Sequence, residues 1–463
     1  MPVKRIPDVF VIVFLLVMLA AVATWVLPGG EYERRREQVG DTTREVVVPG
    51  SFRTVPAVPQ LAEVFTAPVL GFLKLAEIIA FIFIVGGAFA ILNDTGAIAA
   101  GIGKLVVVLR GREYLVIPTV MVFFSFFGAV FGMCEEAIPF VLIFVPLAIA
   151  LGYDSLVGVC LTFVAAGVGF AGAFINPFTL QIAQGVAGVP LLSGMGYRVV
   201  VWTVATAAVV AWVMVYAARI HREPSRSPMF ELDRARREEI LAQQQEQKSF
   251  TARHAAALSV LGLGIVAMIL GVILLEWYIT ELAGLFLAMG VASGLVSGMN
   301  PNAMAKGFVA GAKDIAGAAL IVAFAGGILV LLQDGRVLDT ILHGAASLLG
   351  RLPALLSAYV MYLVQMAINF FIPSGSTKAA LTMPIMAPLA DLSGLTRQTA
   401  VLAYQLGDGF NNMIIPTSGV TMATLGLARI PYQIWLRWHW PMQVLFFALG
   451  LLALVWPVIT RWP

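Results

Sequence analysis

Charged residues are scarce in this sequence. Asp, Glu, Lys and Arg make up 12% of its 463 residues, whereas soluble domains carry roughly a quarter. Hydrophobic residues make up 60%, and the mean hydropathy is +0.92. This composition predicts a polytopic membrane protein whose partner is the lipid bilayer; a small-molecule substrate is predicted only from the repeats described below. The formal net charge of +3 is little guide to partners, because membrane proteins gather basic residues in cytoplasmic loops, and we expect no nucleic-acid partner.

Cysteines and the common motifs of enzymes are also lacking. The two cysteines, Cys134 and Cys160, lie in apolar surroundings, so neither a disulfide framework nor a thiolate metal site is predicted. The sequence contains no HExxH, Walker, CxxC or GxSxG motif, and these motifs mark many hydrolases and ATPases. We therefore expect a protein that is not an enzyme and that holds no cofactor.

Long apolar runs predict the membrane spans. Residues 8–27 are long enough to cross a bilayer, and we interpret them as a retained first helix. Lys4 and Arg5 place the N-terminus in the cytoplasm by the positive-inside rule, although the basic run Arg34–Arg36 would then lie outside, against that rule. Further spans are predicted at 76–92, 197–218, 255–276, 282–299, 315–332 and 437–457, and amphipathic or weaker helices at 61–73, 97–109, 301–312 and 337–350.

The two halves of the chain contain three matching stretches in the same order. The pairs are Val85–Asp94 with Ala325–Asp334, Phe126–Ala137 with Ile368–Ala379, and Gly169–Thr179 with Gly409–Gly419. The second pair places Glu136 opposite Lys378, and the first contains a Gly-Gly pair in each half that we interpret as close helix packing. Three matches in one order predict a duplication.

We predict an all-α polytopic membrane protein built from two inverted repeats. The segments are 1–60 (first helix and extracytoplasmic loop), 61–218 (repeat 1, with a hairpin at 114–151 and a broken helix at 154–188), 219–253 (cytoplasmic linker) and 254–463 (repeat 2, with a hairpin at 354–391 and a broken helix at 397–428). Inverted repeats with discontinuous helices are typical of secondary transporters with a midplane site. We favour re-entrant hairpins, whose polar tips meet near the centre; two full crossings per hairpin are the alternative.

The candidate site lies at the helix breaks. Pro373 and Gly375 prevent an ordinary helix, and the backbone groups that they leave unpaired must be satisfied by protein, water or a ligand. An ionisable group at membrane depth costs at least ~2.5 kcal/mol, so the ionisable residues near the breaks are the strongest candidates. The predicted substrate-binding residues are Glu135, Glu136, Asn176, Thr179, Ser374, Gly375, Ser376, Thr377, Lys378, Asp408, Asn411, Asn412, Thr417 and Ser418.

Each candidate also has a structural alternative. One of the two glutamates is expected to meet a cationic substrate group or a coupling ion, unless it is paired with backbone donors or Lys378. Lys378 is expected to hold a substrate carboxylate, unless it snorkels to the interface. Asp408 is expected to meet a cation, unless it serves as a cap or in packing. The hydroxyl and amide residues flank half-helix N-termini, which suit anions, or are only caps.

Four stretches resemble the YfcC family, in the DcuC-type anaerobic C4-dicarboxylate carrier and arginine/ornithine antiporter group of the ion-transporter superfamily. They are Gly132–Glu136, Ile175–Thr179 with Ile182–Gly185, Ile372–Ser376 and Gly407–Gly419. The resemblance implies a homodimer in the bacterial inner membrane, with a scaffold and a mobile transport domain in each protomer. It also implies elevator-like transport, with substrate held at the hairpin tips. Better-known relatives carry Ser-Asn-Thr at both tips, so this chain departs from the pattern behind their sodium chemistry and dicarboxylate preference.

The charges of the candidate site indicate the substrate. Glu135, Glu136 and Asp408 against Lys378 leave a negative balance if all ionise, which suits a ligand or coupling ion (Na⁺ or H⁺) that brings positive charge. We predict an antiporter or ion-coupled symporter for a basic amino acid such as arginine or ornithine; the alternative is a sodium- or proton-coupled carrier of C4-dicarboxylates or other short carboxylates. A channel would need a continuous polar pore, and an enzyme would need its histidines (221, 254, 343, 439) near the tips.

Overall fold

The computed structural model describes residues 7–39, 42–246, 250–275, 277–347 and 352–462. Within them, nine helices are long and apolar enough to cross a membrane. They are α1 (Val9–Val26), α3 (Ala76–Asp94), α5 (Val116–Phe131) with the turn before it, α10 (Met195–Arg222), α12 (Ala252–Leu275), α13 (Ile279–Val296), α15 (Ala316–Asp334), α17 (Ala354–Phe371) and α21 (Tyr432–Thr460). All the predicted spans are among them, together with the first arm of each predicted hairpin. The chain is a polytopic membrane protein, and its described residues are all-helical apart from four short strands.

Helix α1 shows how the spans are specified. The carboxylate of Asp8 accepts a hydrogen bond from the backbone N–H of Phe10 at 2.9 Å, which caps the helix start. The helix is apolar all round, as expected of a membrane span. One side packs against α15, while Leu15, Leu19 and Val26 on the other are exposed and suited to contact lipid.

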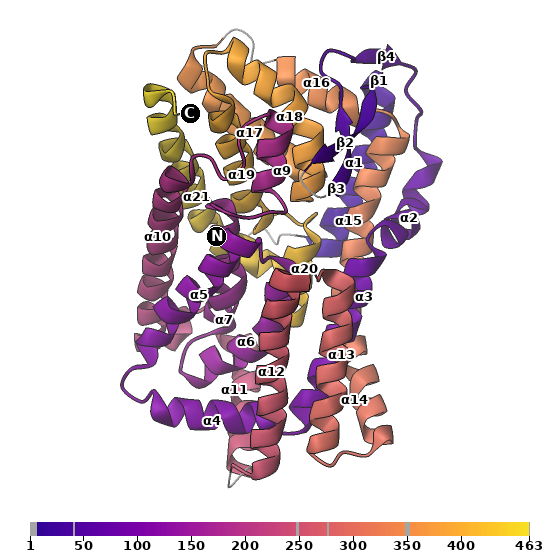
Figure 1. The fold of residues 1–463 in the computed structure, drawn as a ribbon. Coiled ribbons are helices and arrows are strands. Elements are labelled where there is room, and N and C mark those ends of the chain that lie inside the picture. The colour runs from indigo at the N-terminus through magenta and orange to yellow at the C-terminus, as the bar shows by residue number, and fades with distance from the viewer. Residues whose placement is uncertain (1–6, 40–41, 247–249, 276, 348–351, 463) are drawn as a thin grey trace.

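Two helical hairpins lie at opposite ends of the molecule. In the first, α5 ends at Gly132, which has φ 71°; a Cβ there would lie 2.6 Å from Asn176 Oδ1, so glycine is required for two reasons. A 3₁₀ turn (Glu135–Phe140) and α6 (Val141–Ala150) follow. In the second, α17 ends before Pro373 and α18 (Gly375–Leu392) begins directly after it. Figure 1 shows α5 and α6 in the lower half and α17 and α18 in the upper half.

Each hairpin is followed by an interrupted helix. In the first half, α7 (Ser155–Val159) continues through a π-helical turn into α8 (Ala165–Ala171), and after a gap α9 (Leu180–Ala187) begins. In the second half, α19 (Arg397–Asn412) and α20 (Gly419–Leu427) are separated by a gap. The gaps, residues 172–179 and 413–418, contain Asn176-Pro177 and Pro416. Proline and the lost backbone hydrogen bonds account for both interruptions.

Corresponding helices of the two halves make corresponding contacts. Helix α2 (Ala67–Lys74) packs on α15, and α14 (Pro301–Asp314) packs on α3. A Cβ on Gly71 would lie 2.3 Å from Ala323 O, and one on Gly311 would lie 2.3 Å from Gly86 O. The Gly-Gly pairs at 86–87 and 326–327 lie at these contacts, so their predicted role in close packing is confirmed.

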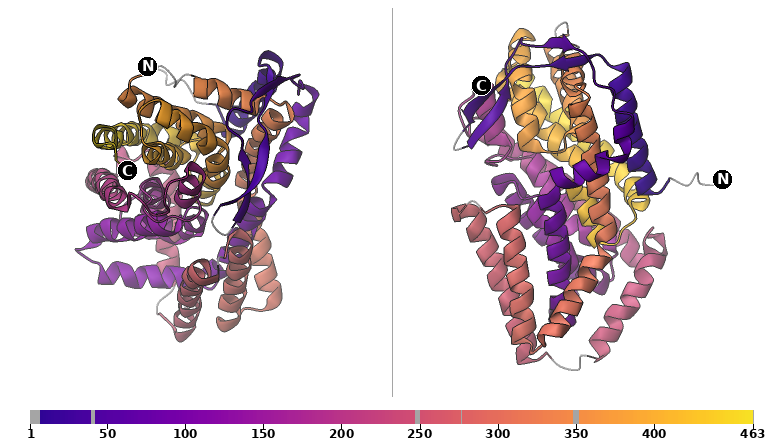
Figure 2. Two further views of the ribbon diagram at one scale, coloured as in Figure 1. Left: turned by 45° about the horizontal axis from the view of Figure 1, so that its top comes forward. Right: turned by 90° about the vertical axis from the view of Figure 1, so that its right-hand side faces the viewer.

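The polar loop after α1 contains four strands that the sequence analysis did not predict. Strand β1 (Gly29–Glu31) pairs with β4 (Arg53–Val55), and β2 (Arg34–Val39) pairs with β3 (Thr42–Val47), both antiparallel. Strand β3 packs against α18, where Val46 and Val47 are buried. Figure 2 shows these indigo strands along the surface of the helical body. The loop is also tied to α16 (Leu338–Ser347), since Asp339 accepts the backbone N–H of Tyr32 at 2.9 Å.

Two further helices lie away from the tips. Helix α4 (Ala97–Val108) packs against α12, and α11 (Phe230–Glu246), in the predicted linker, packs against α6 and α4. Arg236 of α11 donates to Ala428 O at 2.8 Å and to Arg429 O at 3.0 Å, at the C-terminus of α20. Asp233, one turn before, accepts the backbone N–H of Ser155 at 2.8 Å, at the N-terminus of α7. Helix α11 therefore joins one helix from each half, with each charge at the helix end that it stabilises.

Candidate substrate site at the helix breaks

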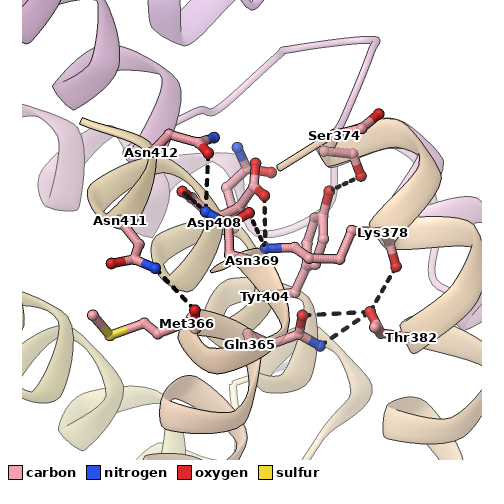
Figure 3. Close-up of polar contacts among 12 residues, drawn as sticks. Gln365, Met366, Asn369, Ser374, Lys378, Thr382, Tyr404, Asp408, Asn411 and Asn412 are labelled. Atoms are coloured by element: carbon pink, nitrogen blue, oxygen red, sulfur yellow. Dashed lines mark hydrogen bonds and ion pairs between the residues drawn. The ribbon is translucent and has the colours of Figure 1, made fainter. Parts of the chain in front are cut away.

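A buried ion pair lies beside the second hairpin tip. Lys378, in the first turns of α18, places Nζ 2.6 Å from Oδ1 of Asp408 on α19, and neither side chain is exposed to solvent. Figure 3 shows the two side chains pointing toward one another. A buried pair of charges is stable only when further polar contacts compensate for lost hydration. Both residues are site candidates from the sequence, which does not indicate that they pair with one another.

Residues that the sequence analysis missed surround this pair. Asn369 on α17 accepts from Lys378 Nζ through Oδ1 at 3.1 Å, and its Nδ2 donates to Asp408 O at 3.2 Å and to Asn412 Oδ1 at 2.9 Å. The Tyr404 ring centroid lies 5.2 Å from Nζ, within cation–π range, and its hydroxyl donates to Gly375 O at 2.6 Å. Asn369 and Tyr404 could have been found as polar residues in apolar helices, at i, i+4 spacing from Gln365 and Asp408 respectively.

The two halves of the chain meet at Gly375. A Cβ on this glycine would lie 2.6 Å from Thr179 Cγ2 and 2.9 Å from Asp408 Oδ2. Thr179 precedes α9 of the first half, whereas Gly375 and Asp408 belong to the second. Thr179 Oγ1 and Asp408 Oδ2 are buried with no hydrogen-bond partner among the described residues. The unpaired oxygens near this contact offer acceptors for a bound donor or cation.

The first hairpin tip carries two glutamates in different surroundings. Glu136 is buried, accepts the backbone N–H of Cys134 at 3.1 Å, and lines a cavity of about 20 Å³ beside Met268, Ile269 and Val272 of α12. Such a cavity has room for about one water molecule, not for a substrate. Glu135 is partly exposed and lies within electrostatic range of Asp408. Glu135 is therefore the better placed of the two to contact a ligand.

A tyrosine outside the hairpins also approaches this tip. Tyr278, which directly precedes α13, stacks on Phe178 in the first helix break, with the ring centroids 6.1 Å apart. Glu135 and Glu136 are both within electrostatic range of the Tyr278 hydroxyl. Because Phe178 lies in the break and Tyr278 in the α12–α13 turn, the contact joins the site to a helix pair outside the hairpins. No sequence signal pointed to Tyr278.

The residues in the helix breaks divide into caps and unpaired groups. Asn176 Oδ1 accepts from the N–H groups of Phe178 and Thr179 at 3.0 and 3.2 Å, and Ser418 Oγ caps α20 through Thr421 N at 3.3 Å. Ser418 fits the capping alternative, whereas Asn176 stabilises the turn before α9, a helix with no side-chain cap. Thr417 Oγ1 and Asn176 Nδ2 are buried without a hydrogen-bond partner in the described part of the chain. Each break therefore keeps one polar group that could form a hydrogen bond with a ligand.

The remaining candidates lie at the edge of the site or stabilise it. Ser374 and Thr377 are exposed and bond to one another at 3.0 Å, and Ser376 is partly exposed. Asn411 Nδ2 donates to Met366 O at 2.9 Å, holding α19 against α17. Asn412 accepts from Asn369, as described above. The structure therefore brings Thr179, Gly375, Lys378 and Asp408 together and leaves Ser374 and Thr377 facing outward.

A cavity lies against the second arm of each hairpin. One, of about 500 Å³, is lined by Thr377, Ala380 and Leu381 of α18 together with residues of α15, α16 and the strand loop. The other, of about 390 Å³, is lined by Val141, Val145 and Pro146 of α6 together with α3, α14 and α11. Both are large enough for an amino acid or a small carboxylate.

Comparisons with known proteins give relatives over nearly the whole chain. The family model described as "C4-dicarboxylate anaerobic carrier" (DcuC) matches residues 6–459. The chain is 42% identical over 474 residues to the "Putative basic amino acid antiporter YfcC" of Escherichia coli, covering 94% of this chain and 93% of that protein. It is 29% identical over 490 residues to an uncharacterized protein of Haemophilus influenzae, covering 97% and 96%.

Two solved structures are also similar in part. The YdaH transporter of Alcanivorax borkumensis aligns with a TM-score of 0.42 and 17% identity over 99% of both chains. MtrF of Neisseria gonorrhoeae aligns with a TM-score of 0.44 and 14% identity over 97% of this chain and 95% of that one.

Proposed function

We propose that this chain, which belongs to the C4-dicarboxylate anaerobic carrier (DcuC) family and is therefore a membrane transporter and not an enzyme, exchanges basic amino acids across the bacterial inner membrane. Arginine and ornithine are the substrates that we favour. The name of the YfcC relative, a basic amino acid antiporter, agrees with this substrate class.

The observation that carries the proposal is the charge of the first hairpin tip. In the described part of the chain, Lys378 forms an ion pair with Asp408, and neither Glu135 nor Glu136 is paired with a Lys or Arg. Carboxylates at membrane depth are costly unless a cation compensates for them. An ammonium or guanidinium group of the substrate would supply that cation at Glu135, the more accessible of the two.

The start of α18 suits the other end of an amino acid. No side chain caps this helix, because the hydroxyl of Ser374 bonds to Thr377 instead. Free N–H groups at a helix N-terminus attract anions, and Gly375, with no Cβ, allows close approach. The substrate carboxylate would bind there, and its cationic group would extend toward Glu135.

The two cavities support alternating access. Each lies against one hairpin arm, α18 in the upper half and α6 in the lower half of Figure 1. Two re-entrant hairpins in inverted repeats, with a site between their tips, would let substrate enter from one cavity and leave by the other. We extend the proposal to an elevator mechanism, with residues 114–218 and 354–463 moving against the remaining helices, in a homodimer with a cytoplasmic N-terminus.

A dicarboxylate carrier is the second candidate, favoured by the family description and by the uncapped start of α18. A C4-dicarboxylate would bind there only with protonated glutamates or co-bound cations to offset Glu135 and Glu136. This requirement makes it the weaker candidate for the site as it stands.

Counterflow in proteoliposomes tests the proposal. Vesicles containing the purified protein are loaded with unlabelled arginine, and uptake of labelled arginine is followed with arginine, ornithine, lysine, succinate or fumarate as competitor. We expect uptake that saturates, depends on internal arginine, and is inhibited by ornithine but not by succinate. Exchange of succinate with no exchange of arginine would support the dicarboxylate carrier instead.

A further inference from the structure

The ammonium group of Lys378 lies in a cage of the kind that binds metal cations. Its Nζ is 2.6 Å from Asp408 Oδ1, 3.1 Å from Asn369 Oδ1 and 5.2 Å from the ring centroid of Tyr404. Carboxylate and amide oxygens are the ligands that hard cations such as Na⁺ prefer. Figure 3 shows them converging on Nζ from α17 and α19.

The cage is held in place by its own contacts. Both Nδ2 hydrogen bonds of Asn369, to Asp408 O and Asn412 Oδ1, turn its Oδ1 toward the ammonium group. The Tyr404 hydroxyl is fixed by Gly375 O, and the backbone O of Lys378 accepts from the hydroxyl of Thr382 at 2.8 Å. The amide oxygen of Asn369 would therefore keep its position if the ammonium group were removed, and the buried carboxylate of Asp408 would be left without a cation.

The cage also lies where a transporter binds a coupling ion. Secondary transporters coordinate Na⁺ at the ends of discontinuous helices, and this cage joins the start of α18 to α19 near its break. Asp408 needs one positive charge, and Lys378 supplies it from within the chain. A second cation at Asp408 Oδ1 would meet repulsion from the ammonium group at contact distance.

We propose that the Lys378 ammonium group is a tethered cation that occupies the place of a coupling sodium ion, so that the carrier works without sodium. The inference rests on the proposed carrier function and defines its ion requirement. Removing the ammonium group while keeping Asp408 and Asn369 should leave a vacant oxygen site that binds Na⁺.

The test compares wild type, Lys378→Met, Lys378→Arg and the double variant Lys378→Met/Asp408→Asn. Arginine counterflow is measured in buffers containing either Na⁺ or choline at equal ionic strength. Wild type should show rates within about twofold in the two buffers. Lys378→Met should be at least about fivefold faster in Na⁺, because Na⁺ bound at the vacated oxygen site stabilises the folded form of that site. Lys378→Arg keeps the charge and the double variant lacks the carboxylate, so neither should respond to Na⁺.

A second readout does not depend on transport. The melting temperature of the purified protein in detergent is measured as NaCl replaces choline chloride. Lys378→Met should be stabilised in a saturable manner by Na⁺, whereas wild type and the double variant should not. A folded Lys378→Met protein that melts at the same temperature in both salts overturns the inference.

The outcomes separate this inference from the proposed function. No arginine counterflow by wild type in either buffer would contradict the function, while the melting experiment would still decide the cation site. A wild type that requires Na⁺ for counterflow overturns the tethered cation even if Lys378→Met does not fold, and sodium-independent exchange by wild type supports it.

Discussion

Gly375 and Thr179 belong to opposite halves of the chain, yet a Cβ on Gly375 would lie 2.6 Å from Thr179 Cγ2. The second hairpin tip therefore rests directly on the helix break of the first half. Asp408 Oδ2 lies on the same side, 2.9 Å from that Cβ position. Any motion of the tip must change the surroundings of the Lys378–Asp408 pair, so both halves contribute to the environment of this ion pair.

Replacing Gly375 with alanine should impair transport without unfolding the protein. The added methyl group would push the tip away from Thr179, and contacts under 3.0 Å force a shift of backbone or side chains. We expect the transport rate for arginine to fall at least about tenfold, since small displacements of binding groups have large effects. Gly317→Ala, where an added Cβ meets nothing within 4 Å, is the matched control. Partial recovery in Gly375→Ala/Thr179→Ser would identify the methyl clash as the cause; equal rates in the two glycine variants would refute it.

The two glutamates of the first tip should differ in their effects. Glu135→Gln should raise the KM for arginine about tenfold to a hundredfold, because a hydrogen bond to a charged group contributes ~1.5–3 kcal/mol. Glu136→Gln should change it less, because Glu136 accepts Cys134 N and faces the small cavity at α12. Uptake kinetics in proteoliposomes measure both, with the exposed Glu231→Gln on α11 as control. A larger increase in KM for Glu136→Gln than for Glu135→Gln would place the substrate at Glu136.

Loss of the Arg236 side chain should destabilise the protein. Its guanidinium donates to two backbone carbonyls at the end of α20, so Arg236→Ala should cost about 2 kcal/mol of unfolding free energy. Arg236→Lys should recover only part of that unfolding free energy, because one ammonium group cannot replace the planar guanidinium group, which donates to both carbonyls at once. Thermal unfolding in detergent measures the difference. Arg234→Ala, which removes an exposed pair with Glu238, should have almost no effect; an equal loss in both variants would show that the carbonyl contacts of Arg236 are unimportant.

Tyr32 in the strand loop should make stability depend on alkaline pH. Burial, and then the charge of Asp339, raise the pKa of Tyr32 from its usual 10.0 to about 12. The unfolded chain therefore ionises first, and the stability that the neutral hydroxyl contributes is complete below pH 10 and is lost as pH rises toward 12. The melting-temperature gap between wild type and Tyr32→Phe should narrow between pH 8 and about pH 11. A constant gap would mean that the hydroxyl is not shielded from solvent.

The sequence predicted individual helices and charged residues better than their partners. Apolar length marks spans such as α1, and proline and glycine mark the end of α17, because both signals are local. The pairing of Lys378 with Asp408 depends on how α18 packs against α19, which no local pattern encodes. Strand β2 (Arg34–Val39) has no apolar alternation; it forms because its partner β3 packs on α18, and tertiary contact outweighs strand propensity.

The measurement that tests the central claim most directly is ligand protection of the native Cys134. This residue stands at the first hairpin tip between Gly132 and Glu135, within electrostatic range of Asp408. In a Cys160→Ala background, a small thiol reagent should label Cys134, and saturating arginine should slow labelling while succinate at the same concentration should not. Ser376→Cys in a Cys134→Ser, Cys160→Ala chain should show the same protection at the second tip. Labelling of both positions at rates indifferent to every transported substrate would contradict a single site between the two tips.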